Sequence, residues 1–209
     1  MSSIKRLIDG FHKFRNRYFV QDKELFEQLN SEGQTPKTLV IGCSDSRVDP
    51  ALLLQANPGD IFVIRNVANL VPPYEEGGGY HGVSSAIEFA VNYLKVENIV
   101  VLGHEHCGGI NALWNSDTNQ QNAFINSWVQ IASEAKIEVL QESPDAPLKD
   151  QLDSCAKKAV LISMENLMSF PFIQQRMKLN NLKIYGWFFE LDGGRLLEFN
   201  FAEKKFIDI

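Results

Sequence analysis

Two short segments of the sequence contain the residue types of a metal site. One segment runs Cys43-Ser44-Asp45-Ser46-Arg47, and the other runs His104-Glu105-His106-Cys107. Two cysteine thiolates and one imidazole are a known ligand set of catalytic zinc, which keeps its fourth coordination position open for water or substrate. These residues therefore predict a catalytic zinc site with Cys43, His104 and Cys107 as its ligands.

A carboxylate–guanidinium pair, Asp45 and Arg47, lies close to the first of these ligands. Asp45 can accept a hydrogen bond from hydroxide at the open zinc position, and Arg47 can hold Asp45 ionised and in place. The same position also allows Asp45 to become a fourth zinc ligand and close the site. The pair is therefore predicted to be catalytic, with an open and a closed state as alternatives.

The other thiol and imidazole groups have simpler interpretations. Cys155 is predicted to be a small core residue, and His12 and His81 are predicted to lie on the surface or in loops. His106 lies inside the ligand segment and is predicted to be a neighbour without metal contact. Residues 77–82 fit the glycine pattern of dinucleotide-binding proteins, but they follow a segment with loop composition instead of a strand, so they are predicted to be a surface loop.

The segments that must position the two ligand groups alternate between strands and helices. Short runs rich in Val and Ile predict buried parallel strands at residues 38–42, 61–65 and 98–103. Helices are predicted between them at residues 51–55 and 83–94. Cys43 and His104 each follow directly on a strand, and open parallel sheets bind ligands outside the carboxyl ends of their strands. The two ligand groups are therefore expected to meet at one edge of the sheet.

The flanking regions complete an α/β fold. Apolar residues at helical spacing predict an N-terminal helix over residues 4–19, whose aromatic side chains indicate packing on another body such as a second subunit. Further helices are predicted at residues 122–140 and 149–168, and a hairpin at residues 183–191 and 195–201. The sequence thus predicts one domain over residues 1–209: a central, mostly parallel β-sheet flanked by helices, with an N-terminal helical arm over residues 1–36 and a C-terminal helical and hairpin region.

Composition excludes several classes of function. The net charge of −6 provides no large basic field, so neither nucleic acid nor an anionic membrane surface is an expected partner. No apolar run is long enough to cross a bilayer, and the N-terminus lacks a secretory signal, so a cytoplasmic protein is expected. Three cysteines in a reducing compartment favour metal binding or catalysis over a disulfide framework.

Three motifs together resemble the beta-class carbonic anhydrases. They are Cys-Ser-Asp-Ser-Arg-Val at residues 43–48, the run from Pro-Gly-Asp-Ile-Phe to Val-Pro-Pro at residues 58–73, and Gly-His-x-x-Cys-Gly-Gly at residues 103–109. The resemblance implies reversible hydration of carbon dioxide to bicarbonate and a proton by zinc-bound hydroxide. It also implies Cys43, His104 and Cys107 as zinc ligands, with Asp45 and Arg47 as the catalytic pair.

The resemblance extends to residues that would contact the substrate. It implies that Gln34 hydrogen-bonds the substrate and that the backbone N–H of Gly108 supports bicarbonate. It places Phe62, Val67 and Phe89 along a narrow apolar cleft for carbon dioxide. Phe89 stands where many relatives have Tyr, so this chain lacks one hydroxyl there.

One subset of the family regulates itself by binding bicarbonate at a second site, through a Trp, an Arg and a Tyr. This chain keeps Arg65 but has Val40 and Phe189 at the other two positions. The resemblance therefore implies the constitutively open subtype, with Asp45 held by Arg47. It also implies a homodimer or a higher homo-oligomer with the cleft at the subunit interface.

Two other functions stay open at this stage. The same hydroxide could attack carbonyl sulfide or carbon disulfide, which would make the protein a hydrolase of a related small molecule. A non-catalytic zinc or bicarbonate-sensing protein is the second alternative. Gln34, Asp45 and Arg47 speak against it, because a purely structural zinc site needs none of them.

Overall fold

The computed structural model describes residues 2–77, 79–115 and 123–209. The chain forms two compact units, Met1–Thr35 and Pro36–Ile209, and each is described by itself. The predicted start of a helix at residue 122 and the glycine at position 78 lie outside the described residues.

The N-terminal unit is helical. Helix α1 (Ser3–Asn16) continues into a π-helical turn, η1 (Arg17–Gln21), which confirms the helix predicted at residues 4–19. A second helix that the sequence did not predict, α2 (Glu24–Glu32), carries Phe26, whose ring lies 4.8 Å from that of Phe19 and 5.6 Å from that of Phe14. The apolar side chains nearer the N-terminus stay exposed: Ile4, Leu7, Ile8 and Phe11.

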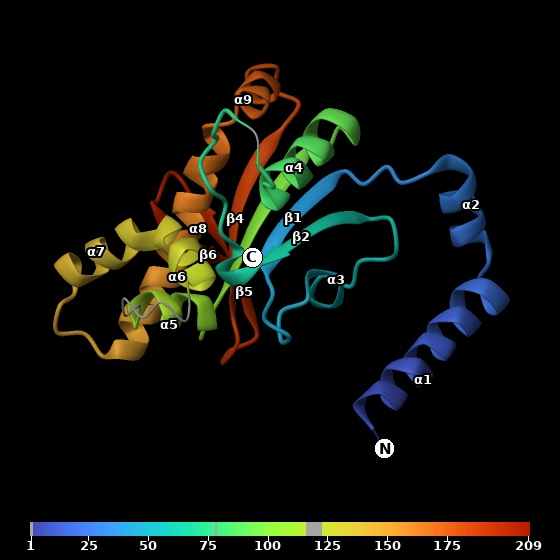
Figure 1. The fold of residues 1–209 in the computed structure, drawn as a ribbon, viewed down its shortest axis with the longest axis horizontal. Helices are drawn as coiled ribbons and strands as arrows, with labels where there is room; N and C mark the ends of the chain where they lie inside the picture. Colours follow the sequence, from blue (N-terminus) through green and yellow to red (C-terminus); the bar gives the residue numbers. More distant parts are fainter. Residues whose placement is uncertain (1, 78, 116–122) are drawn as a thin grey trace. The chain divides into compact units, whose positions relative to one another are not determined.

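A six-stranded sheet forms the centre of the second unit (Figure 1). The strands are β1 (Thr38–Cys43), β2 (Ile61–Asn66), β3 (Asn98–His104), β4 (Lys183–Glu190), β5 (Arg195–Asn200) and β6 (Lys205–Asp208). Their order is β2-β1-β3-β4-β5-β6, and the first four are parallel while β5 and β6 are antiparallel to their neighbours. The mostly parallel sheet and its hairpin are as predicted, and β6 is an addition.

Helices and short helical turns connect the strands. They are α3 (Pro50–Leu53), η2 (Val67–Asn69), α4 (Gly82–Glu88), η3 (Phe89–Tyr93), α5 (Gly108–Trp114), α6 (Ala123–Val129), η5 (Gln130–Ala132), α7 (Ser133–Glu142), α8 (Leu148–Met168) and α9 (Pro171–Lys178). The helix predicted at residues 83–94 becomes π-helical in its second half, and the one predicted up to residue 140 is divided by η5. Helix α9 was not predicted. Among the residues described here, no helix has the length and apolar character needed to span a bilayer.

The sheet is buried on both faces. On one face, Leu39, Ile41 and Val101 join the main core with side chains of α4, α5, α7 and α8. On the other face, Val40, Val100 and Leu102 form a smaller core with Leu53 and Leu54 at the end of α3. Helix α8 lies so close to β3 that a Cβ atom on Gly103 would come within 2.5 Å of the Val160 Cγ2 atom. This glycine therefore lets the longest helix pack directly beside the strand that ends in His104.

Candidate metal centre

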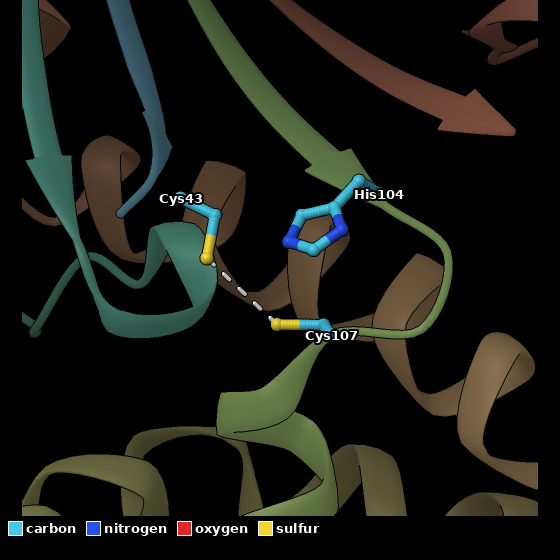
Figure 2. Close-up of side chains that lie close together, drawn as sticks. All are labelled: Cys43, His104 and Cys107. Carbon is cyan, nitrogen blue, oxygen red and sulfur yellow. Dashed lines mark hydrogen bonds between the residues drawn. The ribbon is translucent and has the colours of Figure 1, made fainter. Parts of the chain in front are cut away.

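The three predicted zinc ligands come together at the carboxyl edge of the parallel strands (Figure 2). Cys43 is the last residue of β1 and His104 is the last residue of β3, its hydrogen-bonded neighbour. Cys107 lies directly before α5, in the N-cap position. The ligand atoms of the three side chains all lie within 4.8 Å of one another, and all three residues are buried. The positions inferred from the strand ends are thus brought into one cluster.

The spacing and hydrogen bonding of this cluster fit a zinc ion. The two Sγ atoms lie 3.9 Å apart, close to the separation of about 3.8 Å that follows from two Zn–S bonds of about 2.3 Å in a tetrahedron. The Nδ1 atom of His104 lies 2.7 Å from the carbonyl oxygen of Glu105, so Nδ1 carries the proton and donates it. Within the described residues, Nε2 of His104 is buried without a hydrogen-bond partner, which leaves its lone pair for a metal.

The thiols of Cys43 and Cys107 share one hydrogen bond, which lowers the pKa of one thiol and raises the pKa of the other. The hydrogen bond from Cys107 lowers the pKa of Cys43 to about 4, and the same bond together with burial raises the pKa of Cys107. Cys43 is therefore the more acidic of the two thiols. Binding of a divalent cation to both sulfurs would release the proton of their hydrogen bond, because the thiolate is the metal-binding form.

Asp45 and Arg47 form a two-pronged ion pair beside this cluster. Arg47 donates from Nη2 to Asp45 Oδ2 at 2.7 Å and from Nε to Oδ1 at 2.9 Å. The backbone N–H of Arg47 also donates to Oδ1 at 2.9 Å. These hydrogen bonds hold the pKa of the Asp45 carboxyl well below its usual range. Asp45 is therefore an ionised acceptor that pairs with Arg47 instead of joining the ligand group.

Arg65 braces the loop that carries Cys43 and Asp45. Its Nε donates to the backbone carbonyl of Cys43 at 2.9 Å, and its Nη2 donates to the carbonyl of Asp45 at 2.7 Å. Its Nη1 donates to Asp49 Oδ2 at 2.6 Å, and the other oxygen of Asp49 caps α3. In the sequence, only the family resemblance pointed to Arg65. In the structure, its hydrogen bonds hold the backbone between Cys43 and Asp49 in place.

The predicted substrate contacts are arranged in two groups. The rings of Phe62 and Phe89 lie 5.9 Å apart, and both are partly exposed. Val67 lies against the helix that follows Cys107, since a Cβ atom on Gly109 would come within 2.6 Å of its Cγ1. Gly108 is the first residue of α5 and has open space where a side chain would be. Gln34 belongs to the unit Met1–Thr35, and its role remains a prediction.

The residues predicted to lie outside the site do so. His106 stays out of the ligand cluster and bonds Asp192 through Nε2 at 3.2 Å. His12 and His81 are exposed, and Cys155 is fully buried in the core. The described part of segment 77–82 is loop up to α4, without a preceding strand.

Comparison with known proteins agrees with this geometry. The family model described as carbonic anhydrase matches residues 38–196. Beta carbonic anhydrase 3 of Arabidopsis thaliana is 38% identical over 189 residues, which cover 89% of this chain and 72% of the relative. The chain belongs to the beta-carbonic anhydrase family. It is accordingly an enzyme, a carbonic anhydrase.

Solved structures of beta-carbonic anhydrases share the fold over nearly the whole chain. The structure of the beta-carbonic anhydrase CcaA superposes with a TM-score of 0.92 at 35% identity and covers 100% of both chains. One of two tetrameric beta-carbonic anhydrases from Sordaria macrospora superposes with a TM-score of 0.79 at 28% identity, over 93% of this chain and 94% of that one. The fold of this chain is therefore that of the family.

Proposed function

We propose that the protein hydrates carbon dioxide reversibly to bicarbonate and a proton, with zinc held by Cys43, His104 and Cys107. The observation that carries the proposal is the buried Cys–His–Cys cluster, in which the free Nε2 of His104 faces two sulfurs at zinc-compatible spacing. When bound, zinc supplies Lewis-acid chemistry, because it lowers the pKa of water at its open position to roughly 7 at favourable sites.

Asp45 and Arg47 would orient the reacting water. An ionised carboxylate can only accept hydrogen bonds, so Asp45 fixes the direction in which a neighbouring O–H group points. Arg47 keeps the carboxylate ionised and occupies both of its oxygens from one side. The remaining lone pairs of Asp45 are then available to the reacting molecule, which is the positioning that a hydration reaction needs.

The apolar side chains would hold a substrate that makes few polar contacts. Carbon dioxide is linear and lacks a dipole, so an apolar wall such as the Phe62–Phe89 pair suits it better than a polar cleft. The product is an anion, and we assign its support to the backbone N–H of Gly108, while the predicted contact of Gln34 with the substrate rests on the resemblance alone. We assign Val67, which lies against α5, to the same cleft.

We further infer the open subtype, in which Arg47 holds Asp45. The two-pronged ion pair between Arg47 and Asp45 supports this state. The residues at two of the three positions of the regulatory bicarbonate site support it too. Val40, buried in the sheet, replaces the Trp, and Phe189 lacks the hydroxyl of the Tyr. All three guanidinium nitrogens of Arg65 are engaged with the loop. Rates measured against rising bicarbonate should therefore show no sigmoidal inhibition, and a sigmoidal curve would contradict this subtype.

A homodimer or higher homo-oligomer is part of the proposal. Apolar side chains of α1 remain exposed in the described unit Met1–Thr35, and exposed apolar stripes of this kind mark interaction surfaces. A relative from Sordaria macrospora is described as tetrameric. The cytoplasmic location remains a prediction from the sequence.

Stopped-flow carbon dioxide hydration by the zinc-loaded protein tests the proposal. The parent should accelerate the reaction over buffer between about pH 7 and 9, where a zinc-activated water is available. Asp45→Asn should retain zinc but lose activity by roughly 100-fold or more. Asp145→Asn, an exposed turn residue between α7 and α8, is the matched control and should equal the parent. A parent that does not hydrate carbon dioxide but hydrolyses carbonyl sulfide would overturn the proposed substrate.

A further inference from the structure

The turn between two predicted zinc ligands has an unusual backbone. Glu105 and His106 separate His104 from Cys107, and His106 has a φ of 54°. This left-handed conformation is uncommon for a residue with a Cβ atom and persists where surrounding contacts hold it. The turn therefore depends on partners outside itself.

Those partners come from three other parts of the chain. The backbone N–H of Glu105 donates to the carbonyl of Phe189 in β4 at 3.0 Å. The backbone N–H of His106 donates to Asp153 Oδ1 of α8 at 3.2 Å, and its ring Nε2 lies 3.2 Å from Asp192 Oδ1. The backbone N–H of Asp192, in turn, donates to Glu105 Oε2 at 3.0 Å. Asp192 thus touches both residues of the turn.

Both carbonyl groups of the turn face the metal centre's own residues. The Glu105 carbonyl accepts the Nδ1 proton of His104 at 2.7 Å and so sets the tautomer and the ring orientation of that ligand. The His106 carbonyl accepts a hydrogen bond from Arg47 Nη2 at 3.2 Å. A shift of this turn would therefore move one ligand and one member of the Asp45–Arg47 pair together.

Asp192 is itself fixed in place. It lies in the turn between β4 and β5, and its second oxygen, Oδ2, accepts a hydrogen bond from Lys149 Nζ at 2.7 Å. Lys149, followed by His106, holds the pKa of the Asp192 carboxyl below its usual value, so both oxygens are available as acceptors. Oδ2 contacts Lys149 of α8, and Oδ1 contacts His106 in the turn between His104 and Cys107.

We infer that Asp192 is a positioning residue for the metal centre, acting through His106 and Glu105 on His104 and Arg47. The inference rests on the proposed function, because it concerns the efficiency of that same site. The side chains of Glu105, His106 and Asp192 also lie within 4.8 Å of one another. A cation bound among them would have to displace the Lys149 ammonium, so the positioning role is the one that the contacts favour.

The test compares Asp192→Ala and Asp192→Asn with the parent in their zinc-loaded forms. The matched control is Glu203→Ala, which removes the exposed ion pair with Lys205 (2.7 Å) in the β5–β6 turn. Because β5 is antiparallel to β4, that turn lies at the end of the sheet away from the ligands. Three quantities are measured: the rate of zinc release to a chelator, kcat and KM for carbon dioxide hydration, and the melting temperature.

Asp192→Ala should release zinc roughly tenfold faster and lower kcat roughly tenfold, with KM unchanged, as is typical when a residue that orients a metal ligand is lost. Its melting temperature should stay at the parent value, because the exposed side chain contributes little to global stability. Asp192→Asn keeps an oxygen acceptor for His106 and should recover part of both losses. Glu203→Ala should match the parent in all three quantities.

Parent-like zinc release and kcat in Asp192→Ala would overturn the inference. Equal losses in both Asp192 variants together with a lower melting temperature would also overturn it, because they indicate a general structural role. Failure of the proposed function would look different: the parent itself would then not hydrate carbon dioxide. The comparison of zinc release would still decide the role of Asp192 in that case.

Discussion

Arg65 donates a hydrogen bond from Nε to the backbone carbonyl of Cys43 over 2.9 Å, and so links the edge strand β2 to the first residue of the Cys–His–Cys cluster. The same guanidinium also holds the carbonyl of Asp45 and the carboxylate of Asp49. One side chain therefore holds Cys43, Asp45 and the start of α3 together as a unit. This fork geometry is available to arginine and not to lysine.

Substitution of Arg65 should consequently affect both stability and catalysis. Arg65→Ala leaves two backbone carbonyls without their donor and is expected to cost about 1 to 3 kcal/mol of unfolding free energy. Arg65→Lys keeps the charge but should recover only part of this loss. Denaturant unfolding and kcat of the zinc-loaded protein measure the two effects. Lys37→Ala breaks an exposed ion pair with Glu97 near the opposite end of β1, and it should leave both quantities unchanged.

Two buried cysteines should respond differently to substitution. Cys107→Ala removes one of the three clustered ligands, so the purified protein should contain far less than one zinc ion per chain. Cys155→Ala should retain the full zinc content, because burial raises the pKa of that thiol to about 12 and keeps it protonated inside α8. Metal analysis after dialysis measures the difference. Full zinc content in Cys107→Ala would remove Cys107 from the ligand set.

The hydrogen-bonded thiols of Cys43 and Cys107 predict an order of thiol reactivity. Removal of zinc with a chelator should expose Cys43 as the first thiol to react with an alkylating reagent, because its pKa is lowered to about 4 by the hydrogen bond from Cys107. Cys155 should react only after unfolding, since it is fully buried. Peptide mapping after timed alkylation identifies each site. Early labelling of Cys155 in the folded protein would contradict this order.

Local sequence patterns were sufficient to predict the sheet and the positions of the clustered Cys43 and His104 at its edge. The apolar runs before Cys43 and His104 form strands that end at these two residues, so the predicted strand ends also predicted that the two side chains would meet at one edge of the sheet. The cap at Asp49 and Pro50 was also predictable, because it depends on adjacent residues only. These features are all encoded within a few positions of the chain.

The contacts that hold the site were not predictable in this way. Asp192 meets His106 across 86 positions of sequence, and an aspartate in a Gly-rich turn gives no sign of such a partner. The π-helical turns at Arg17–Gln21 and Phe89–Tyr93 likewise follow no distinct residue pattern. The contact between Asp192 and His106 is decided by tertiary structure, so the sequence shows only which chemical groups are available for it.

The aromatic pair Phe62 and Phe89 should influence substrate binding more than metal binding. Phe62→Ala removes the ring that packs 5.9 Å from that of Phe89 and opens the proposed apolar wall. KM for carbon dioxide should rise roughly tenfold, within the range that lost apolar contacts give in other pockets, with zinc content unchanged. Phe201→Ala, an exposed aromatic next to the β5–β6 turn, is the control and should keep the parent KM. An unchanged KM in Phe62→Ala would remove this wall from the proposed cleft.

The exposed apolar stripe of α1 should determine the size of the assembly. Leu7 and Phe11 lie one helical turn apart and are 70% and 58% exposed, so water contacts two large apolar side chains unless another chain covers them. Leu7→Glu combined with Phe11→Glu should therefore lower the molar mass measured by light scattering after size-exclusion chromatography. Asn16→Glu adds charge at the end of the same helix without removing apolar surface, and it should keep the parent mass. If the double variant also keeps that mass, this face of α1 is not part of the subunit interface.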